Sequence, residues 1–166
     1  MKYKETDTGF PARYARTIAY YQMKDPDRAL NLLEPLIADH PENPYLWELK
    51  GQILFEFNRV AQAEEPQRKS VQLKPDAALL RVNLGQTLIN LNDPKKVEEG
   101  VQELKRSLLN DPDNSVTWRL LAQAYDTQKK DENLVDDVQL SQPPKAVDDQ
   151  FTVRPGRTSK LHVLDN

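Results

Sequence analysis

Apolar residues recur along this chain of 166 residues in runs typical of helices, and three prolines separate the runs. Pro41, Pro75 and Pro112 each follow an apolar run and precede an acidic or amide residue that can begin a new helix. The intervals between these prolines are 34 and 37 residues. A period of this length predicts pairs of helices that stack on one another, because no single pair can bury its apolar face alone.

Alignment on these prolines divides the helical part of the chain, 10–140, into four units. The expected units are 10–43, 44–77, 78–114 and 115–140, with 1–9 as an N-terminal extension and 141–166 as a linker and tail. Small residues are expected where the two helices of a unit touch, and these are Gly51, Gly85, Ala122, Ala29, Ala63 and Gly100. Trp47 and Trp118 are expected to fill the space between successive hairpins.

Within each unit, the order of large residues, small residues and a final proline resembles the sequence pattern of the tetratricopeptide repeat family. The second unit carries it most fully, with Trp47, Gly51, Leu54, Ala63 and Pro75. The resemblance implies an all-α fold, a right-handed superhelical stack of about four helical hairpins. It also implies that the first helix of each hairpin lines a concave groove that binds another polypeptide.

Several positions depart from the repeat. Pro35 and Pro66 fall inside second helices, where proline costs about 3 kcal/mol, so short or kinked helices are expected there. Glu65 and Gln67 occupy positions where apolar residues are expected. The three extra residues of the third unit are placed between its two helices, near 91–96, and in the fourth unit 131–139 is expected to form only a weak second helix.

The tail has a different pattern. Residues 150–154 and 160–164 alternate between apolar and polar, and Pro155-Gly156 between them indicates a turn. The tail is therefore expected to be irregular or hairpin-like. Its sequence from Ala146 to Phe151 resembles the start of bacterial cadherin-like or immunoglobulin-like repeats, which occur in secreted surface proteins.

Composition and charge narrow the classes of function. The net charge of −3 and the mixing of acidic with basic residues give no reason to expect a nucleic-acid partner. No apolar stretch is long enough for direct membrane insertion, and the chain has no cysteine. Its two histidines, His40 and His162, lack any metal-binding or catalytic motif. No enzyme activity, metal or cofactor is expected.

The groove residues follow from the inward positions of the first helices. They are Tyr14, Tyr21, Glu48, Gln52, Phe55, Asn83, Gln86, Asn90, Arg119 and Gln123. Gln52, Gln86 and Gln123 occupy the same place in successive units, and such a series of amides could bind the backbone of an extended peptide. The alternative is that glutamine is simply a good exposed helix residue.

Two further runs resemble a narrower family. Pro11-Ala12-Arg13-Tyr14-Ala15 and Glu48-Leu49-Lys50-Gly51-Gln52 are similar to the C-terminal repeat region of bacterial periplasmic HExxH zinc metallopeptidases. The resemblance implies an extracytoplasmic, periplasmic setting. It carries no catalytic residue over to this chain.

These observations predict a non-catalytic module that binds a protein or an extended peptide, with self-association left open. Two alternatives remain at this point. One is the substrate-presenting accessory region of a zinc metallopeptidase. The other is a structural spacer in a secreted multi-domain adhesin.

Overall fold

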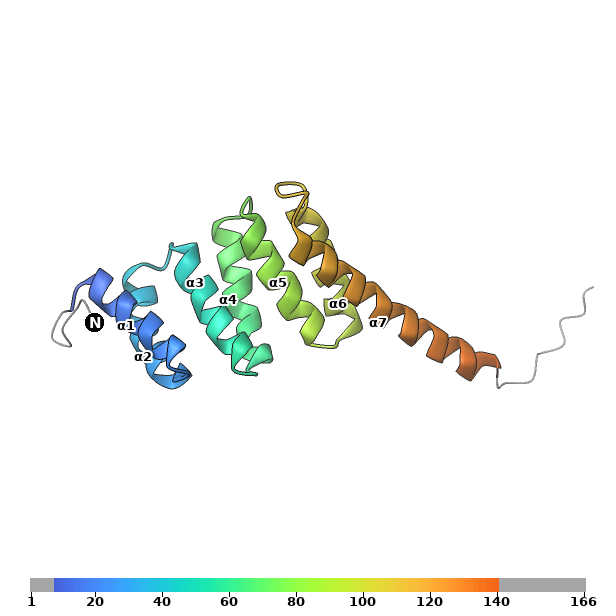
Figure 1. The fold of residues 1–166 in the computed structure, drawn as a ribbon, viewed down its shortest axis with the longest axis horizontal. Helices are drawn as coiled ribbons and strands as arrows, with labels where there is room; N and C mark the ends of the chain where they lie inside the picture. The colour runs from blue at the N-terminus through green and yellow to red at the C-terminus, as the bar shows by residue number, and fades with distance from the viewer. Residues whose placement is uncertain (1–7, 141–166) are drawn as a thin grey trace, which may run out of the picture.

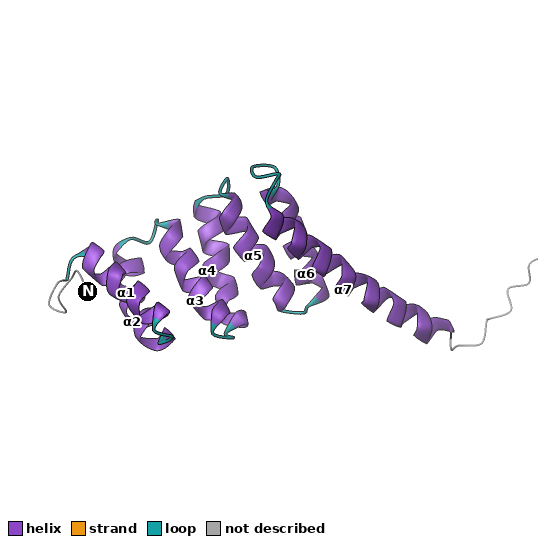
Figure 2. Cartoon of the chain, viewed as in Figure 1, coloured by secondary structure: helices purple, strands orange, loops and turns teal. Residues whose placement is uncertain are grey.

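The computed structural model describes residues 8–140, and the side chains of 8–129. The described part is entirely helical, and its helices follow one another along an elongated stack (Figures 1 and 2). The helices are α1 (Phe10–Gln22), α2 (Pro26–Asp39), α3 (Pro44–Glu56), α4 (Val60–Leu73), α5 (Ala78–Asn90), α6 (Pro94–Ser107) and α7 (Ser115–Leu140).

Local chemistry explains where these helices begin. The side chains of Asp25, Asn43 and Asp93 each accept a hydrogen bond from a backbone N–H in the first turn of the helix that follows. A proline follows each of these residues, at a position where its missing N–H costs nothing. The caps therefore fix the starts of α2, α3 and α6.

Three hairpins form the stack: α1 with α2, α3 with α4, and α5 with α6. The turn within each hairpin has three residues, one of which adopts a left-handed backbone conformation. These residues are Lys24, Asn58 and Asn92, with φ angles of 62°, 61° and 54°. Asparagine tolerates this conformation better than lysine does. Neighbouring hairpins then contact one another through α2 with α3 and α4 with α5.

The core consists of separate clusters along the stack. One cluster joins α2 to α3 through residues such as Leu33 and Ile53, and α1 packs against it. A second joins Val71 of α4 to α5. A third joins α5, α6 and α7, with Leu104 at 0% exposure. Each cluster therefore stabilises mainly the helices next to it.

Glycines permit the closest helix contacts. A Cβ atom on Gly100 would lie 2.8 Å from the carbonyl oxygen of Gly85, so only glycine allows α5 and α6 to approach this closely. A Cβ atom on Gly51 would instead lie 2.6 Å from the side chain of Gln67. Ala29 and Ala63 are fully buried, as expected for small residues at these contacts.

A repeated hydrogen bond joins each first helix to the loop before it. Trp47 Nε1, Arg81 Nε and Trp118 Nε1 each donate to the carbonyl oxygen of a proline six residues earlier, at 2.8 Å. The acceptors are Pro41, Pro75 and Pro112. We call this contact the loop clasp. It occupies the fourth position of α3, α5 and α7.

The fourth unit differs from the expected hairpin. Instead of two helices, α7 runs without a break over 26 residues, and in Figure 1 its C-terminal part extends beyond the rest of the stack. The segment after Tyr125 contains no glycine or proline that would end a helix. Ala122 is consequently exposed and Trp118 is 55% exposed, so neither has the packing role expected of it.

The prolines in second helices do not shorten them. α2 and α4 both span 14 residues and continue through Pro35 and Pro66, so the expectation of short helices was wrong. Packing on both neighbours stabilises α4 despite its proline, because α4 contacts α3 and α5. Glu65 is exposed, whereas Gln67 is buried.

The extra residues of the third unit lie outside its hairpin. The turn of α5 and α6 has the same three residues as the other hairpin turns, whereas seven residues (108–114) join α6 to α7. The corresponding connections 40–43 and 74–77 have four. The predicted insertion near 91–96 was therefore misplaced. Asn110 in the longer connection donates to the backbone oxygen of Asp76 at 2.8 Å. The predicted tail, 141–166, lies outside the described residues.

Candidate functional site

A cavity of about 370 Å³ opens between α3 and α5, and we call it the inner cavity. Its walls come from the first helices of two successive hairpins, and one residue of α4 contributes as well. The lining residues are Glu48, Gln52, Phe55, Glu56, Gln67, Leu79, Asn83, Gln86 and Thr87. Carboxylates and amides therefore dominate the lining, and none of the described residues in it is basic.

Glu48 and Asn83 face one another across this cavity. Asn83 Nδ2 donates to Glu48 Oε1 at 2.9 Å and so links α3 to α5. Burial raises the pKa of the Glu48 carboxyl above its usual value, although the Asn83 amide acts in the opposite direction. Glu48 is therefore a half-buried carboxylate whose hydrogen-bond partner is neutral.

Tyr21 extends the same polar region towards α1. Burial raises the pKa of the Tyr21 hydroxyl well above its usual range, and the carboxylates of Glu56 and Glu48 raise it further. Gln52 Nε2 donates to Glu56 Oε1 at 3.2 Å. The hydroxyl therefore stays protonated and can act as a hydrogen-bond donor next to two carboxylates.

Gln67 is the contribution of α4 to the cavity. Its side chain is only 1% exposed and fits against Gly51, which has no Cβ to exclude it. The Oε1 atom of Gln67 is buried and accepts no hydrogen bond. Buried polar atoms nearly always have a partner, so this unpaired acceptor is unusual.

The structure brings together five of the ten predicted groove residues in this cavity: Glu48, Gln52, Phe55, Asn83 and Gln86. Of the others, Tyr14 stacks on Phe10 with ring centroids 6.0 Å apart, and Tyr21 lies beside Glu56. Asn90 donates to the backbone oxygen of Gln86. Arg119 and Gln123 are exposed on α7. Their shared role as a groove stays a prediction.

Sequence reasoning did not assign Glu56, Gln67, Leu79 and Thr87 to the site. Three of them lie on first helices, but outside the inward positions that the repeat pattern selects. Gln67 lies on a second helix, and its polarity at an apolar position was the available signal.

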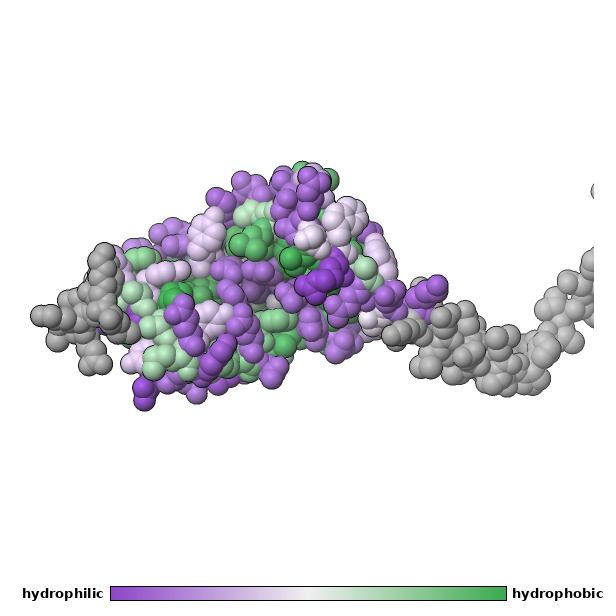
Figure 3. Space-filling model, viewed as in Figure 1, coloured by the Kyte–Doolittle hydropathy of each residue, from purple (hydrophilic) through white to green (hydrophobic). Residues whose placement is uncertain are grey.

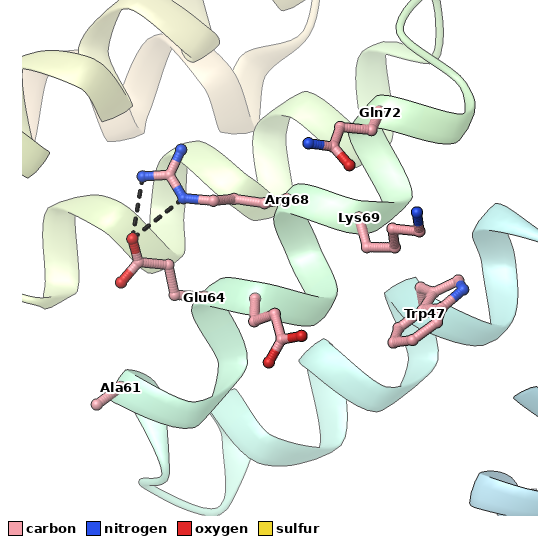
Figure 4. Close-up of a pocket in the computed structure, with 7 residues that line it drawn as sticks. Trp47, Ala61, Glu64, Arg68, Lys69 and Gln72 are labelled. Carbon is pink, nitrogen blue, oxygen red and sulfur yellow. Dashed lines mark hydrogen bonds and ion pairs between the residues drawn. The ribbon is translucent and has the colours of Figure 1, made fainter. Parts of the chain in front are cut away.

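A second cavity, of about 480 Å³, is lined by residues of α4 and by Trp47 of α3, and we call it the outer cavity. Figure 4 shows Trp47 of α3 facing a row of polar side chains on α4, and it shows Glu64 joined to Arg68. Arg68 also binds both oxygens of Glu99, and Lys96 binds Glu64 at 2.6 Å. The charges around this outer cavity therefore neutralise one another.

A third cavity, of about 330 Å³, lies between α1 and α2 and is lined by Arg16, Tyr20, Arg28, Asn31 and Leu32. On the face in Figure 3, apolar side chains form separate patches between polar ones. No helix within 8–140 has the length and apolar character needed to cross a membrane. Among the side chains of residues 8–129, His, Asp and Glu form no group of three or more that could hold a metal ion.

The stacked hairpins with their repeated turns define the class: this is a tetratricopeptide repeat protein. The chain belongs to the family of the cytochrome c-type biogenesis protein H TPR domain, whose model matches residues 12–138.

Curated relatives confirm the resemblance to the repeats of a bacterial protease. The beta-barrel assembly-enhancing protease of Yersinia pestis is 31% identical over 117 residues, which are 70% of this chain and 24% of the relative. Its Escherichia coli K12 counterpart is 28% identical over 113 residues, 68% of this chain and 22% of the relative. The chain thus spans about a quarter of the length of these relatives.

Solved structures share the fold. The first TPR of Spaghetti (RPAP3), bound to an HSP90 peptide, matches with a TM-score of 0.65 and 20% identity, over 70% of this chain and 90% of that one. MamA MSR-1 C2 also matches with a TM-score of 0.65, at 24% identity, over 79% of this chain and 74% of that one. At these identities the likeness concerns the fold alone.

Proposed function

We propose that this chain is a non-catalytic module that binds an extended segment of another polypeptide along α1, α3, α5 and α7. The inner cavity carries the proposal, because it lies between two first helices and presents amide and carboxylate groups to a ligand. Extended peptides have unpaired backbone N–H and C=O groups that such side chains can bind. Structural neighbours were solved with HSP90 and HSP70 peptides, so the fold can accommodate a peptide.

The three glutamines give the proposal a direct test. A library of capped nonapeptides is screened against the chain by fluorescence polarisation. The best binders are then measured on a triple variant with Gln52→Ala, Gln86→Ala and Gln123→Ala. Loss of two or three side-chain hydrogen bonds should weaken binding about 10-fold or more. A matched control replaces three exposed glutamines of the second helices, Gln62, Gln72 and Gln102, by alanine.

Equal affinity of the triple variant and the control variant would refute the claim that Gln52, Gln86 and Gln123 bind the peptide. A library in which no peptide binds the unaltered chain would refute the proposal itself. Circular dichroism on both variants separates a loss of binding from a loss of folding.

The identity to a protease favours a second candidate, in which the module presents substrates to a peptidase domain. The proposal then describes part of a larger enzyme, while the repeats themselves stay non-catalytic. Sequencing the same reading frame decides the matter. A His-Glu-x-x-His domain upstream would support this candidate, and its absence from the complete frame would reject it.

A further inference from the structure

Among the poorly exposed carboxylates of the stack, Glu48 differs from the others in its partner. The Glu64 side chain is 19% exposed and is paired with Arg68 and Lys96. The Glu103 side chain is 8% exposed and is paired with Arg81 and Arg106. Glu48 is bound instead by a neutral amide, and no ion pair involves it in the described part of the chain.

A half-buried carboxylate without a cation is energetically unfavourable. Burial removes part of its hydration, and a neutral hydrogen bond replaces only part of what is lost. The raised pKa of Glu48 is the electrostatic sign of this deficit. A cation brought in by a ligand would therefore gain more at Glu48 than at Glu64 or Glu103, which are already paired.

Gln67 supplies an independent indication of the ligand. Its buried Oε1 lacks a donor, and an unsatisfied buried acceptor destabilises the free protein. The terminal torsion of glutamine is soft, so the amide can turn this oxygen towards a group that enters the cavity. The missing partner is therefore an N–H or O–H donor rather than an acceptor.

We infer that the inner cavity binds a basic side chain, arginine in preference to lysine, of the polypeptide in the groove, with Glu48 as its counter-charge. The inference rests on the proposed function. A guanidinium group presents five N–H donors in one plane, enough for Glu48, Glu56 and the amide oxygen of Gln67. The apolar stem of the ligand side chain lies against Phe55 and Leu79, which also line the cavity.

The same geometry disfavours acidic ligands. A carboxylate in the cavity would face Glu48 and Glu56 with no basic lining residue to offset the repulsion. This chain therefore prefers basic peptides, in contrast to the acidic sequence SRMEEVD that the Spaghetti TPR binds.

The test uses a probe that needs no knowledge of the partner. N-acetyl-arginine methylamide is titrated into the isotope-labelled full chain, and NMR shifts are followed at the side-chain amides of Gln52, Gln67 and Asn83. The neutral isostere N-acetyl-citrulline methylamide is titrated in parallel. We expect saturable shifts with the arginine probe and affinity at least about 10-fold lower with citrulline, because a charge-assisted hydrogen bond is lost.

Variants assign the effect to Glu48. Glu48→Gln should weaken arginine binding about 10-fold and abolish the preference over citrulline, whereas Glu48→Asp should retain the preference. Glu42→Gln, in an exposed loop, makes the same change of net charge and should leave binding unaltered. Equal shifts with both probes, or equal binding by Glu48→Gln and Glu42→Gln, would overturn the inference.

The nonapeptide library separates this inference from the proposed function. Bound peptides enriched in arginine or lysine, with the enrichment lost in Glu48→Gln, support both. Bound peptides without such enrichment refute the basic-side-chain inference and leave peptide binding intact. A library with no binders refutes peptide binding. If the arginine probe still binds at Glu48 in that case, Glu48 belongs to a cation site that is not part of a peptide groove. The inference that the cavity binds a basic side chain of a polypeptide would then be refuted too.

Discussion

Glu48 links stability to binding at the scale of a single residue. A carboxyl whose pKa is raised by folding binds protons more readily in the folded chain, so its ionisation destabilises the fold. The destabilisation is absent below the ordinary pKa, near 4.5, and is complete once the pH exceeds the raised value. The residue that would attract a cation therefore lowers the stability of the free protein at neutral pH.

Replacement of this carboxylate should accordingly stabilise the free chain. We expect Glu48→Gln to raise the Tm at pH 7, since glutamine can still accept the hydrogen bond from Asn83. The difference from the unaltered chain should shrink as the pH falls towards 4. Thermal unfolding followed by circular dichroism across this range measures it. A Tm difference that stays constant with pH would contradict the electrostatic origin.

The glycines of the stack also act at this scale. Gly100→Ala should destabilise the chain by about 1–3 kcal/mol, because its Cβ would meet the rigid carbonyl of Gly85. Gly51→Ala should cost less, because it meets the flexible end of Gln67, which can move. Urea unfolding measures both variants. Gly9→Ala, whose Cβ would find only ordinary contact at 3.8 Å, is the control and should change little.

The inner cavity shows what residue patterns could predict. The repeat register placed Glu48, Gln52 and Gln86 on one surface, because positions on first helices recur with the hairpin. It could not place Gln67, because its location depends on the space that Gly51 leaves on a different helix. A contact between two different helices, such as that of Gln67 with Gly51, can be predicted only from how the helices pack. The period of residues along one helix does not contain this information.

At the scale of elements, the prolines of α2 and α4 show how packing overrides helix propensity. Both helices pass through their prolines at full length, since their apolar faces are buried against neighbouring helices.

The position of the insertion in the third unit was predicted wrongly because of how the units were aligned. Alignment on Pro112 assigned the extra residues to the hairpin turn. The cap pair Asp93-Pro94, which matches Asp25-Pro26, indicates instead that the turn has its usual length.

Replacement of a proline inside a helix should increase the free energy of unfolding. Pro35 is exposed in the interior of α2 and cannot donate to the carbonyl of Asn31. Pro35→Ala restores this donor and should stabilise the chain by about 1–3 kcal/mol, as judged by the urea midpoint. Asn31→Ala, at an exposed position of the same helix, should produce a much smaller gain. An unchanged or lower midpoint in Pro35→Ala would show that the proline is not strained.

At the scale of the whole molecule, separate core clusters make the stack a series of neighbours. Stability in such a series depends on each hairpin and on the contacts to the next one. The two tryptophans report on different regions, because Trp47 packs on the first cluster and Trp118 lies on α7. Local damage should therefore be visible as a difference between the two signals.

Leu33→Ala tests this expectation. Loss of a fully buried leucine from the first cluster costs about 2–5 kcal/mol. In single-tryptophan backgrounds, the unfolding midpoint reported by Trp47 should fall further than the midpoint reported by Trp118. Leu104→Ala, in the cluster that includes α7, should reverse the order. Identical shifts of both midpoints in both variants would indicate one cooperative unit instead.

The loop clasp affects how the sequences of such repeats diverge and how the repeats are detected in a sequence. Tryptophan and arginine differ in charge and hydropathy, yet Trp47 and Arg81 each donate to the carbonyl oxygen of the proline six residues earlier, at the same distance of 2.8 Å. The property retained at this position is thus a planar donor of sufficient reach, and bulk is secondary. Profiles that score the position as aromatic will underrate units such as the third. A designer can likewise exchange the two residues to add a charge or a fluorophore to a repeat while keeping its connection to the preceding loop.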